Sequence, residues 1–267
     1  MTSRAALLVG IGVAAGLSAG CVPLPDPNVR YIAFGDSTTD GPTDADYPGF
    51  VRDLLGEDSA AFAIEARGGE TAGDGVARLR DILDRGLYPN AHTLLYWQGA
   101  TGLLRRAVQL DPLLLASPLD ADYPFRESLT QLLDEIEADI RSAIEAGQGA
   151  GLRVLIATYF PPPDFITTCD ALPTILYFPE QGRAASGYIH HLNERIRRAA
   201  VDTGATLVDV AALESEFRAG PHYYFDCNHL SGRGNARVAE LFVEALLRAL
   251  DECRSRECQS ARSGLEQ

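Results

Sequence analysis

The chain of 267 residues is long enough for one large α/β domain or two small ones, and its 46% hydrophobic content can supply a sizeable core. Its formal net charge of −14 argues against a nucleic-acid-binding surface and against electrostatic docking on anionic lipids. All 23 basic residues are arginine, which excludes a Schiff-base lysine, a phosphate-loop lysine and a Ser-x-x-Lys dyad.

The N-terminus has the pattern of an export signal. Arg4 precedes an apolar run from Ala5 to Leu17, which is shorter than the roughly 20 residues of a membrane span. Small residues then lead directly into Cys21, which resembles the bacterial lipoprotein box with an acylated cysteine, although Ser18 stands where an aliphatic residue is commoner. We expect a signal peptide over residues 1–20, a lipid anchor at Cys21 and a tether over 21–29. Plain secretion is the alternative.

These features predict an exported protein, located in the cell envelope as a periplasmic or outer-membrane lipoprotein, or secreted. The only expected membrane contact is the anchor at Cys21. The cysteine count agrees with export, because four cysteines remain once Cys21 is set aside, an even number suited to an oxidising compartment. They allow three pairings, and the spacing does not choose among them. The disulfide candidates are Cys169, Cys227, Cys253 and Cys258. We expect no metal site.

Five apolar runs alternate with longer amphipathic segments. Each run is nearly continuous in apolar character, which is typical of strands buried on both faces of a parallel sheet. The predicted strands are Tyr31–Phe34, Ala61–Ala66, His92–Trp97, Arg153–Phe160 and Ala205–Val210. The alternation predicts one α/β domain over 30–252 with a parallel sheet and right-handed crossovers, followed by a tail over 253–267. We expect a three-layer α/β/α sandwich with a five-stranded sheet in flavodoxin-like order.

Helical spacing of apolar residues marks three of the intervening segments. These stripes are Leu129, Leu132, Leu133, Ile136, Ile140 and Ile144; then Tyr188, Leu192 and Ile196; and finally Val238, Leu241, Phe242, Ala245 and Leu246. Two stretches, 100–125 and 159–183, interrupt the alternation. Both begin where a predicted strand ends, so they are either binding loops or simple surface insertions.

Ser37 ends the first predicted strand in Phe34-Gly-Asp-Ser37, where a serine is as readily a helix cap as a nucleophile. A nucleophilic serine needs a base. Of the five histidines, His229 has the best context, because Asp226 stands three residues before it and can orient its ring. From these residues alone, a turn with a surface histidine stays open as the alternative to a Ser-His-Asp arrangement.

The order and spacing of these motifs resemble the GDSL, or SGNH, hydrolase family of esterases and lipases. Phe34-Gly-Asp-Ser37 looks like its first block, Gly68-Gly69-Glu-Thr71 like its second, and Asp226-x-x-His229-Leu-Ser-x-x-Gly234 like its last. The resemblance spans roughly residues 30–250. It implies Ser37, Asp226 and His229 as catalytic residues, and the Ser37 and Gly69 amides as oxyanion donors.

One block departs from the family pattern. Ala100 follows Gly99 at the position where the family usually has an asparagine whose side chain is a further oxyanion donor. Loss of one such donor typically costs about 100–1,000-fold in turnover. Gln98 or Thr101 could supply a replacement, or the Ser37 and Gly69 amides could suffice.

The resemblance implies hydrolysis of a carboxylic ester, a small acyl or carbohydrate acetyl ester, through an acyl-serine intermediate. It implies no cofactor, a small-molecule or glycan ester as substrate and no nucleic-acid partner, and we expect a monomer. The alternatives are a catalytically impaired binding protein of the envelope, and an O-acyltransferase acting on envelope polysaccharide.

Overall fold

The computed structural model describes residues 23–41, 45–169 and 176–263, with side chains described as far as Glu252 in the last helix. The predicted signal peptide and Cys21 lie outside the described residues, as do the side chains of Cys253 and Cys258. In the described part of the chain, no helix is both long enough and apolar enough to span a membrane.

Five parallel strands form the central sheet in the order β2-β1-β3-β4-β7. They are β1 (Tyr31–Gly35), β2 (Phe62–Ala66), β3 (Thr93–Trp97), β4 (Arg153–Ala157) and β7 (Thr206–Val208). This confirms the five predicted strands and their flavodoxin-like order. Strands β1 and β3 are buried along their whole length, whereas β2 lies at the edge of the sheet and is only partly buried.

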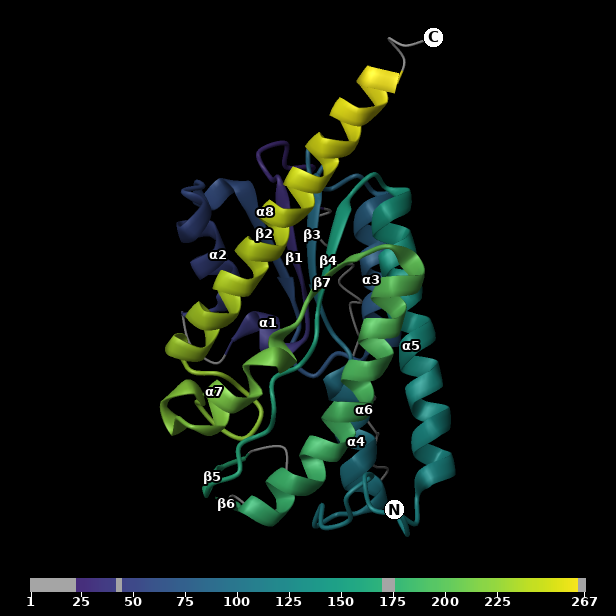
Figure 1. Ribbon diagram of the computed structural model, residues 1–267, viewed down its shortest axis with the longest axis vertical. Coiled ribbons are helices and arrows are strands. Elements are labelled where there is room, and N and C mark those ends of the chain that lie inside the picture. The colour runs from purple at the N-terminus through teal and green to yellow at the C-terminus, as the bar shows by residue number, and fades with distance from the viewer. Residues whose placement is uncertain (1–22, 42–44, 170–175, 264–267) are drawn as a thin grey trace, which may run out of the picture.

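Helices cover both faces of the sheet and give the expected three layers (Figure 1). On one face α2 (Tyr47–Leu55) packs against α8 (Gly232–Ser263). On the other face α3 (Ala72–Asp84) packs against α5 (Arg126–Gly149), which in turn packs against α6 (Pro179–Thr203). The three predicted apolar stripes lie on α5, α6 and α8. The core residues that they bury include Ile140, Leu192 and Phe242.

The two stretches expected as long loops contain regular structure. Residues 100–125 begin with α4 (Ala100–Leu110), because Ala100, Leu103 and Ala107 recur at helical spacing and are buried together. Residues 159–183 contain a two-stranded antiparallel hairpin, β5 (Thr167–Thr168) with β6 (Leu176–Tyr177), and the start of α6. Both stretches follow the carboxyl ends of central strands, as predicted.

The remaining elements are short. They are α1 (Ser37–Asp40), α7 (Glu214–Arg218) and three turns of 3₁₀ helix, Ser59–Ala61, Val210–Leu213 and Pro221–Tyr223. Helix α1 follows β1 directly, and the last 3₁₀ turn leads into the segment before α8. Figure 1 shows α1, α7 and the β5–β6 hairpin near the same end of the sheet.

Candidate active site

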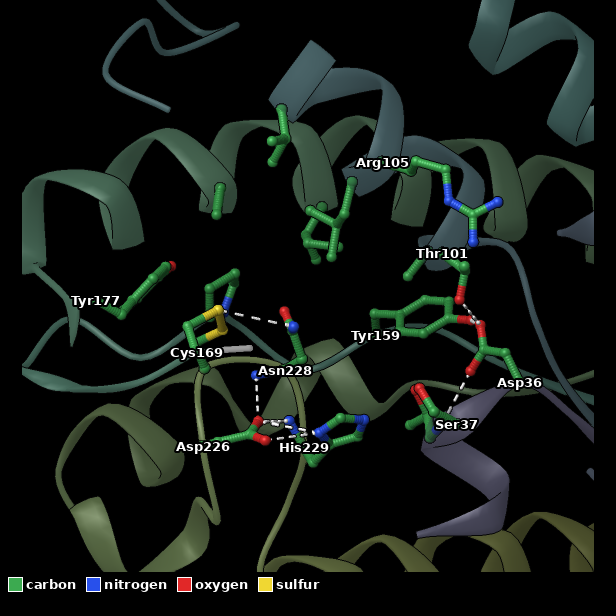
Figure 2. Close-up of a pocket in the computed structure, with 18 of the residues that line it drawn as sticks. Asp36, Ser37, Thr101, Arg105, Tyr159, Cys169, Tyr177, Asp226, Asn228 and His229 are labelled. Carbon is green, nitrogen blue, oxygen red and sulfur yellow. Dashed lines mark hydrogen bonds and ion pairs between the residues drawn. A yellow bond between two sulfur atoms is a disulfide. The ribbon is translucent and has the colours of Figure 1, made fainter. Parts of the chain in front are cut away.

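A pocket of about 570 Å³ lies at the carboxyl end of the sheet, a size common for small-molecule sites. Ser37 after β1, and Asp226 and His229 before α8, all line it (Figure 2). Gly69 after β2 lines it as well. His229 is the one histidine of the five that does so among the described lining residues. The fold therefore brings together residues that are far apart in the sequence.

The backbone around Ser37 depends on a glycine. A Cβ atom on Gly35 would lie 2.2 Å from Thr39 Oγ1 and 2.2 Å from the Trp97 carbonyl oxygen, so only glycine lets α1 and the end of β3 approach this closely. Asp36 then caps α1, because its Oδ1 accepts a hydrogen bond from the Thr38 amide at 3.0 Å. Ser37 thus lies half-buried at the first position of α1, facing the pocket.

Asp36 is a buried carboxyl directly beside Ser37. Its Oδ2 accepts hydrogen bonds from Thr101 Oγ1 at 3.1 Å and from the Tyr159 hydroxyl at 3.2 Å. Burial raises the pKa of Asp36, and the hydrogen bonds from Thr38, Thr101 and Tyr159 offset only part of that rise. Asp36 therefore joins α1, α4 and the segment after β4.

Asp226 and His229 are held together by a tight turn. Asp226 Oδ1 accepts hydrogen bonds from the amides of Asn228 at 2.7 Å and of His229 at 2.8 Å. His229 Nδ1 lies 2.9 Å from Asp226 Oδ2 and 3.0 Å from Oδ1. The imidazole extends from this pair toward Ser37 (Figure 2).

The charge on Asp226 is stabilised locally. Burial opposes its ionisation, but hydrogen bonds from the His229 ring and from the amides of Asn228 and His229 outweigh burial and lower its pKa. Asp226 is therefore a carboxylate near neutral pH. A carboxylate at this position fixes the orientation of the imidazole and favours its protonated form.

A disulfide between Cys169 and Cys227 lines the pocket wall. It links the stretch after β4 to the turn that carries Asp226 and His229, and the Cys227 amide also donates to the Thr168 carbonyl at 3.0 Å. Both cysteines are buried, and Tyr177 packs beside them. This is one of the pairings that the sequence left open.

The Gly68-Gly69 turn lies next to Ser37. A Cβ atom on Gly68 would lie 3.8 Å from Ser37 Cβ, and Gly69 has a positive φ of 79°, which favours glycine. The backbone amides of Ser37 and Gly69 donate to no backbone acceptor among the described residues. Two backbone donors beside the serine are therefore available to a ligand.

The three residues at the start of α4 have different surroundings. Ala100 lines the pocket as the first residue of the helix, and its methyl group offers no donor. Thr101 also lines the pocket, but its hydroxyl donates to Asp36. Gln98 is 1% exposed and does not line the pocket; its Nε2 donates to Glu70 Oε2 at 3.0 Å and to the Thr71 carbonyl at 2.9 Å. Neither Gln98 nor Thr101 therefore takes over the position of the absent asparagine side chain.

The rest of the pocket wall is mainly apolar and comes from α4 and the segment after it, from α6 and from the segment after β4. The lining side chains of this kind are Leu104, Val108, Leu114, Phe160, Pro162, Tyr177, Ala185 and Ile189. Within the described residues, no group of three or more histidine, cysteine, aspartate or glutamate side chains could hold a metal ion.

Sequence reasoning did not single out Tyr159, whose hydroxyl reaches Asp36 and whose ring lines the pocket. The only signal for Tyr159 in the sequence was its place at the end of the fourth predicted strand. Arg105 Nη2 donates to the Gly69 carbonyl at 2.9 Å, and its side chain lines the pocket.

The model of the GDSL-like lipase/acylhydrolase family matches residues 33–237. The chain belongs to this family. The matched range contains Ser37, Gly69, Asp226 and His229, the four pocket residues that the sequence motifs singled out. No curated protein matches the chain.

Several solved structures share the fold. A member of the lipolytic G-D-S-L family from Veillonella parvula has 14% identity and a TM-score of 0.56, covering 82% of this chain and 99% of its own. The acetyl xylan esterase AlAXEase has 20% identity and a TM-score of 0.52, covering 81% and 99%. The esterase EstA from a Pseudoalteromonas species has 14% identity and a TM-score of 0.51, covering 83% and 98%. At these identities the similarity shows the fold alone.

Proposed function

We propose that the protein is a serine hydrolase that cleaves carboxylic esters through an acyl-serine intermediate. The observation that carries this proposal is the His229 ring, held by Asp226 at 2.9 Å and extended toward Ser37 inside one pocket. Membership of the family supports hydrolase chemistry.

In the proposed reaction Ser37 Oγ attacks the ester carbonyl carbon while His229 takes the hydroxyl proton. The Ser37 and Gly69 amides stabilise the negative charge that develops on the carbonyl oxygen. His229 then gives its proton to the departing alcohol as the ester C–O bond breaks. Water repeats the sequence on the acyl-enzyme, releases the carboxylic acid and restores Ser37.

The substrate class follows from the pocket wall. Most of the lining side chains from α4, α6 and the segment after β4 are apolar, which suits the acyl group of a small ester better than a charged group. One of the structural neighbours is an acetyl xylan esterase, so a carbohydrate acetyl ester belongs in the substrate panel.

The test is hydrolysis of p-nitrophenyl acetate and butyrate, followed by an acetylated oligosaccharide. The purified wild-type chain should release p-nitrophenol, and Ser37→Ala should lose that activity, whereas Ser142→Ala on α5 should retain it. Absence of turnover with every ester would contradict the proposal and favour a binding role. Acyl transfer to a sugar hydroxyl in preference to water would favour the acyltransferase alternative.

We also propose that the protein is exported and anchored through an acylated Cys21. The support is the sequence pattern before this residue and the Pro-containing tether after it. Cys21→Ser should release the protein from the membrane fraction into the soluble fraction. Unchanged partitioning would contradict the anchor.

A further inference from the structure

We propose that Gln98 is a positioning residue that fixes the turn presenting the Gly69 amide. This inference rests on the proposed function, because it assigns Gly69 to the oxyanion site. Gln98 stands two residues before Ala100, where the family asparagine is absent. This segment therefore supplies no side-chain donor to the oxyanion, and it would act instead by holding the Gly69 amide in place.

The side-chain amide of Gln98 makes both of its donor contacts to the turn. Its Nε2 donates to Glu70 Oε2 at 3.0 Å and to the Thr71 carbonyl at 2.9 Å. Both acceptors directly follow Gly69 in the sequence. The turn itself is closed by a hydrogen bond of 3.2 Å from the Glu70 amide to the Arg67 carbonyl. Gln98 therefore binds the C-terminal side of the turn at two points.

Glu70 is in turn held by a buried arginine. Arg78 donates to Glu70 from Nε at 2.8 Å and from Nη2 at 2.6 Å, and both side chains are 8% exposed. The guanidinium also lies over the Phe34 ring, with its carbon 4.0 Å from the ring centroid. Phe34 lies on β1, which leads directly into the turn that carries Ser37. The contact between Arg78 and Phe34 therefore connects the Gly69 turn to the backbone that precedes Ser37.

The path of the Gln98 side chain depends on a glycine in α3. A Cβ atom on Gly75 would lie 2.1 Å from Gln98 Oε1 and 2.5 Å from Nε2. The Gln98 side chain therefore passes α3 at Gly75, where any residue larger than glycine would collide with it. On the pocket side, Arg105 Nη2 donates to the Gly69 carbonyl at 2.9 Å, so the turn is held from two directions.

These contacts fix the backbone on the C-terminal side of Gly69, a residue with a positive φ and an exposed position. Glycine is the residue with the greatest backbone freedom, so an unrestrained Gly69 would place its amide poorly. Oxyanion stabilisation depends on donors that are already in position when charge develops, and a misplacement of about 1 Å can cost about 100-fold in rate.

The experiment compares Gln98→Met with Gln148→Met in the full chain. Methionine keeps the length of the side chain and removes both donors. Gln148 is the matched control, because its Nε2 donates to the Thr203 carbonyl at 3.0 Å, in a part of the fold that does not line the pocket. The readout is the rate ratio between an aryl ester and its thionoester, in which sulfur replaces the carbonyl oxygen. Sulfur accepts hydrogen bonds weakly, so it gains less from the oxyanion donors.

We expect Gln98→Met to lower kcat on the ester by about tenfold and to leave KM unchanged. The expected loss is smaller than for removal of an oxyanion donor, because the Gly69 amide would be misplaced and not removed. The ester-to-thionoester ratio should fall in Gln98→Met and stay at the wild-type value in Gln148→Met. Equal losses on both substrates, or an equal fall in the control, would overturn the inference.

If Gln98→Met does not fold, Gln98→Glu serves as the second variant, because it keeps the shape of the side chain. The new carboxyl would face the Glu70 carboxylate and the Thr71 carbonyl, with Arg78 on the far side of Glu70 as the nearby cation. It can donate one hydrogen bond only while protonated. The ester-to-thionoester ratio should therefore fall as pH rises, and a pH-independent ratio would overturn the inference. The outcome is separable from the proposed function, which fails if the wild-type chain turns over no ester or if Ser37→Ala stays active.

Discussion

His229 Nδ1 lies within 3.0 Å of both carboxylate oxygens of Asp226, and the same carboxylate accepts the backbone amide of His229 at 2.8 Å. One aspartate thus fixes both the main chain and the ring of the histidine. The arrangement leaves the imidazole with a single orientation, directed toward Ser37 (Figure 2).

Asp226→Asn should retain the turn and lose the activity. The asparagine carbonyl oxygen can still accept the amides of Asn228 and His229, but its NH₂ group cannot stabilise the protonated ring, and it favours the wrong tautomer. We expect kcat to fall by about 10³–10⁴-fold with little change in KM. Asp164→Asn, an exposed partner of Arg218, is the control and should keep wild-type kinetics. A variant at Asp226 with wild-type kcat would contradict this role.

Asp36 should make the free energy of unfolding fall as pH rises. Burial raises its folded pKa above the unfolded value, so the folded state retains the proton longer. Stability is therefore lost between the ordinary aspartate pKa and the raised folded pKa. Asp36→Asn cannot titrate and keeps an acceptor for the Thr38 amide. As pH rises across that interval, wild type should lose unfolding free energy relative to Asp36→Asn. Urea denaturation at several pH values measures this difference.

Ser142→Ala on α5, which neither adds nor removes a titratable group, is the control for this measurement. Its unfolding free energy should follow the wild-type pH dependence. A constant offset between Asp36→Asn and wild type at every pH would contradict the raised pKa.

The disulfide should support both stability and the site. It closes a sequence separation of 58 residues, and removal of a native disulfide typically costs about 2–4 kcal/mol. The double variant Cys169→Ala/Cys227→Ala should lose stability in that range and show a lower kcat, because Cys227 adjoins Asp226. Chemical denaturation with and without a reductant provides the check. Reductant should lower the stability of the wild type toward that of the double variant and leave the double variant unchanged.

The apolar wall should set the length of the acyl group. Val108 packs against the disulfide cluster and lines the pocket. Val108→Trp should reduce kcat/KM for an octanoyl ester by at least about tenfold relative to an acetyl ester, because the larger side chain fills the space for a longer chain. Val201→Trp, at a position on α6 that is 80% exposed, should leave the ratio unchanged. An unchanged ratio of kcat/KM between the octanoyl and acetyl esters in Val108→Trp would show that the acyl chain does not lie beside Val108.

Much of the fold could be predicted from the sequence, because the five apolar runs are short, nearly continuous and separated by helical stripes such as Leu129 to Ile144. The order of the strands followed from the family resemblance and from the chirality of βαβ units. Helix α4 was missed, since Gly99 and Gly102 interrupt a segment whose buried residues are mostly alanine and leucine.

The site could be predicted only in part. The residues with a motif, Ser37, Gly69, Asp226 and His229, were found, and they line one pocket. The partners of Gln98, Thr101 and Tyr159 could not be found, because each contact joins segments whose approach depends on tertiary packing. The contact of Gln98 with the Glu70 turn, for example, requires α3 to pass close by at Gly75.

The central claim is that Ser37 is a nucleophile activated by His229. The most direct measurement is reaction of the purified chain with a fluorophosphonate probe, followed by peptide mass spectrometry. The account predicts one covalent phosphonyl adduct on Ser37 with loss of fluoride, and labelling slowed by at least about 100-fold in His229→Ala. An unlabelled Ser37 in folded protein, or labelling of equal rate in His229→Ala, would contradict it.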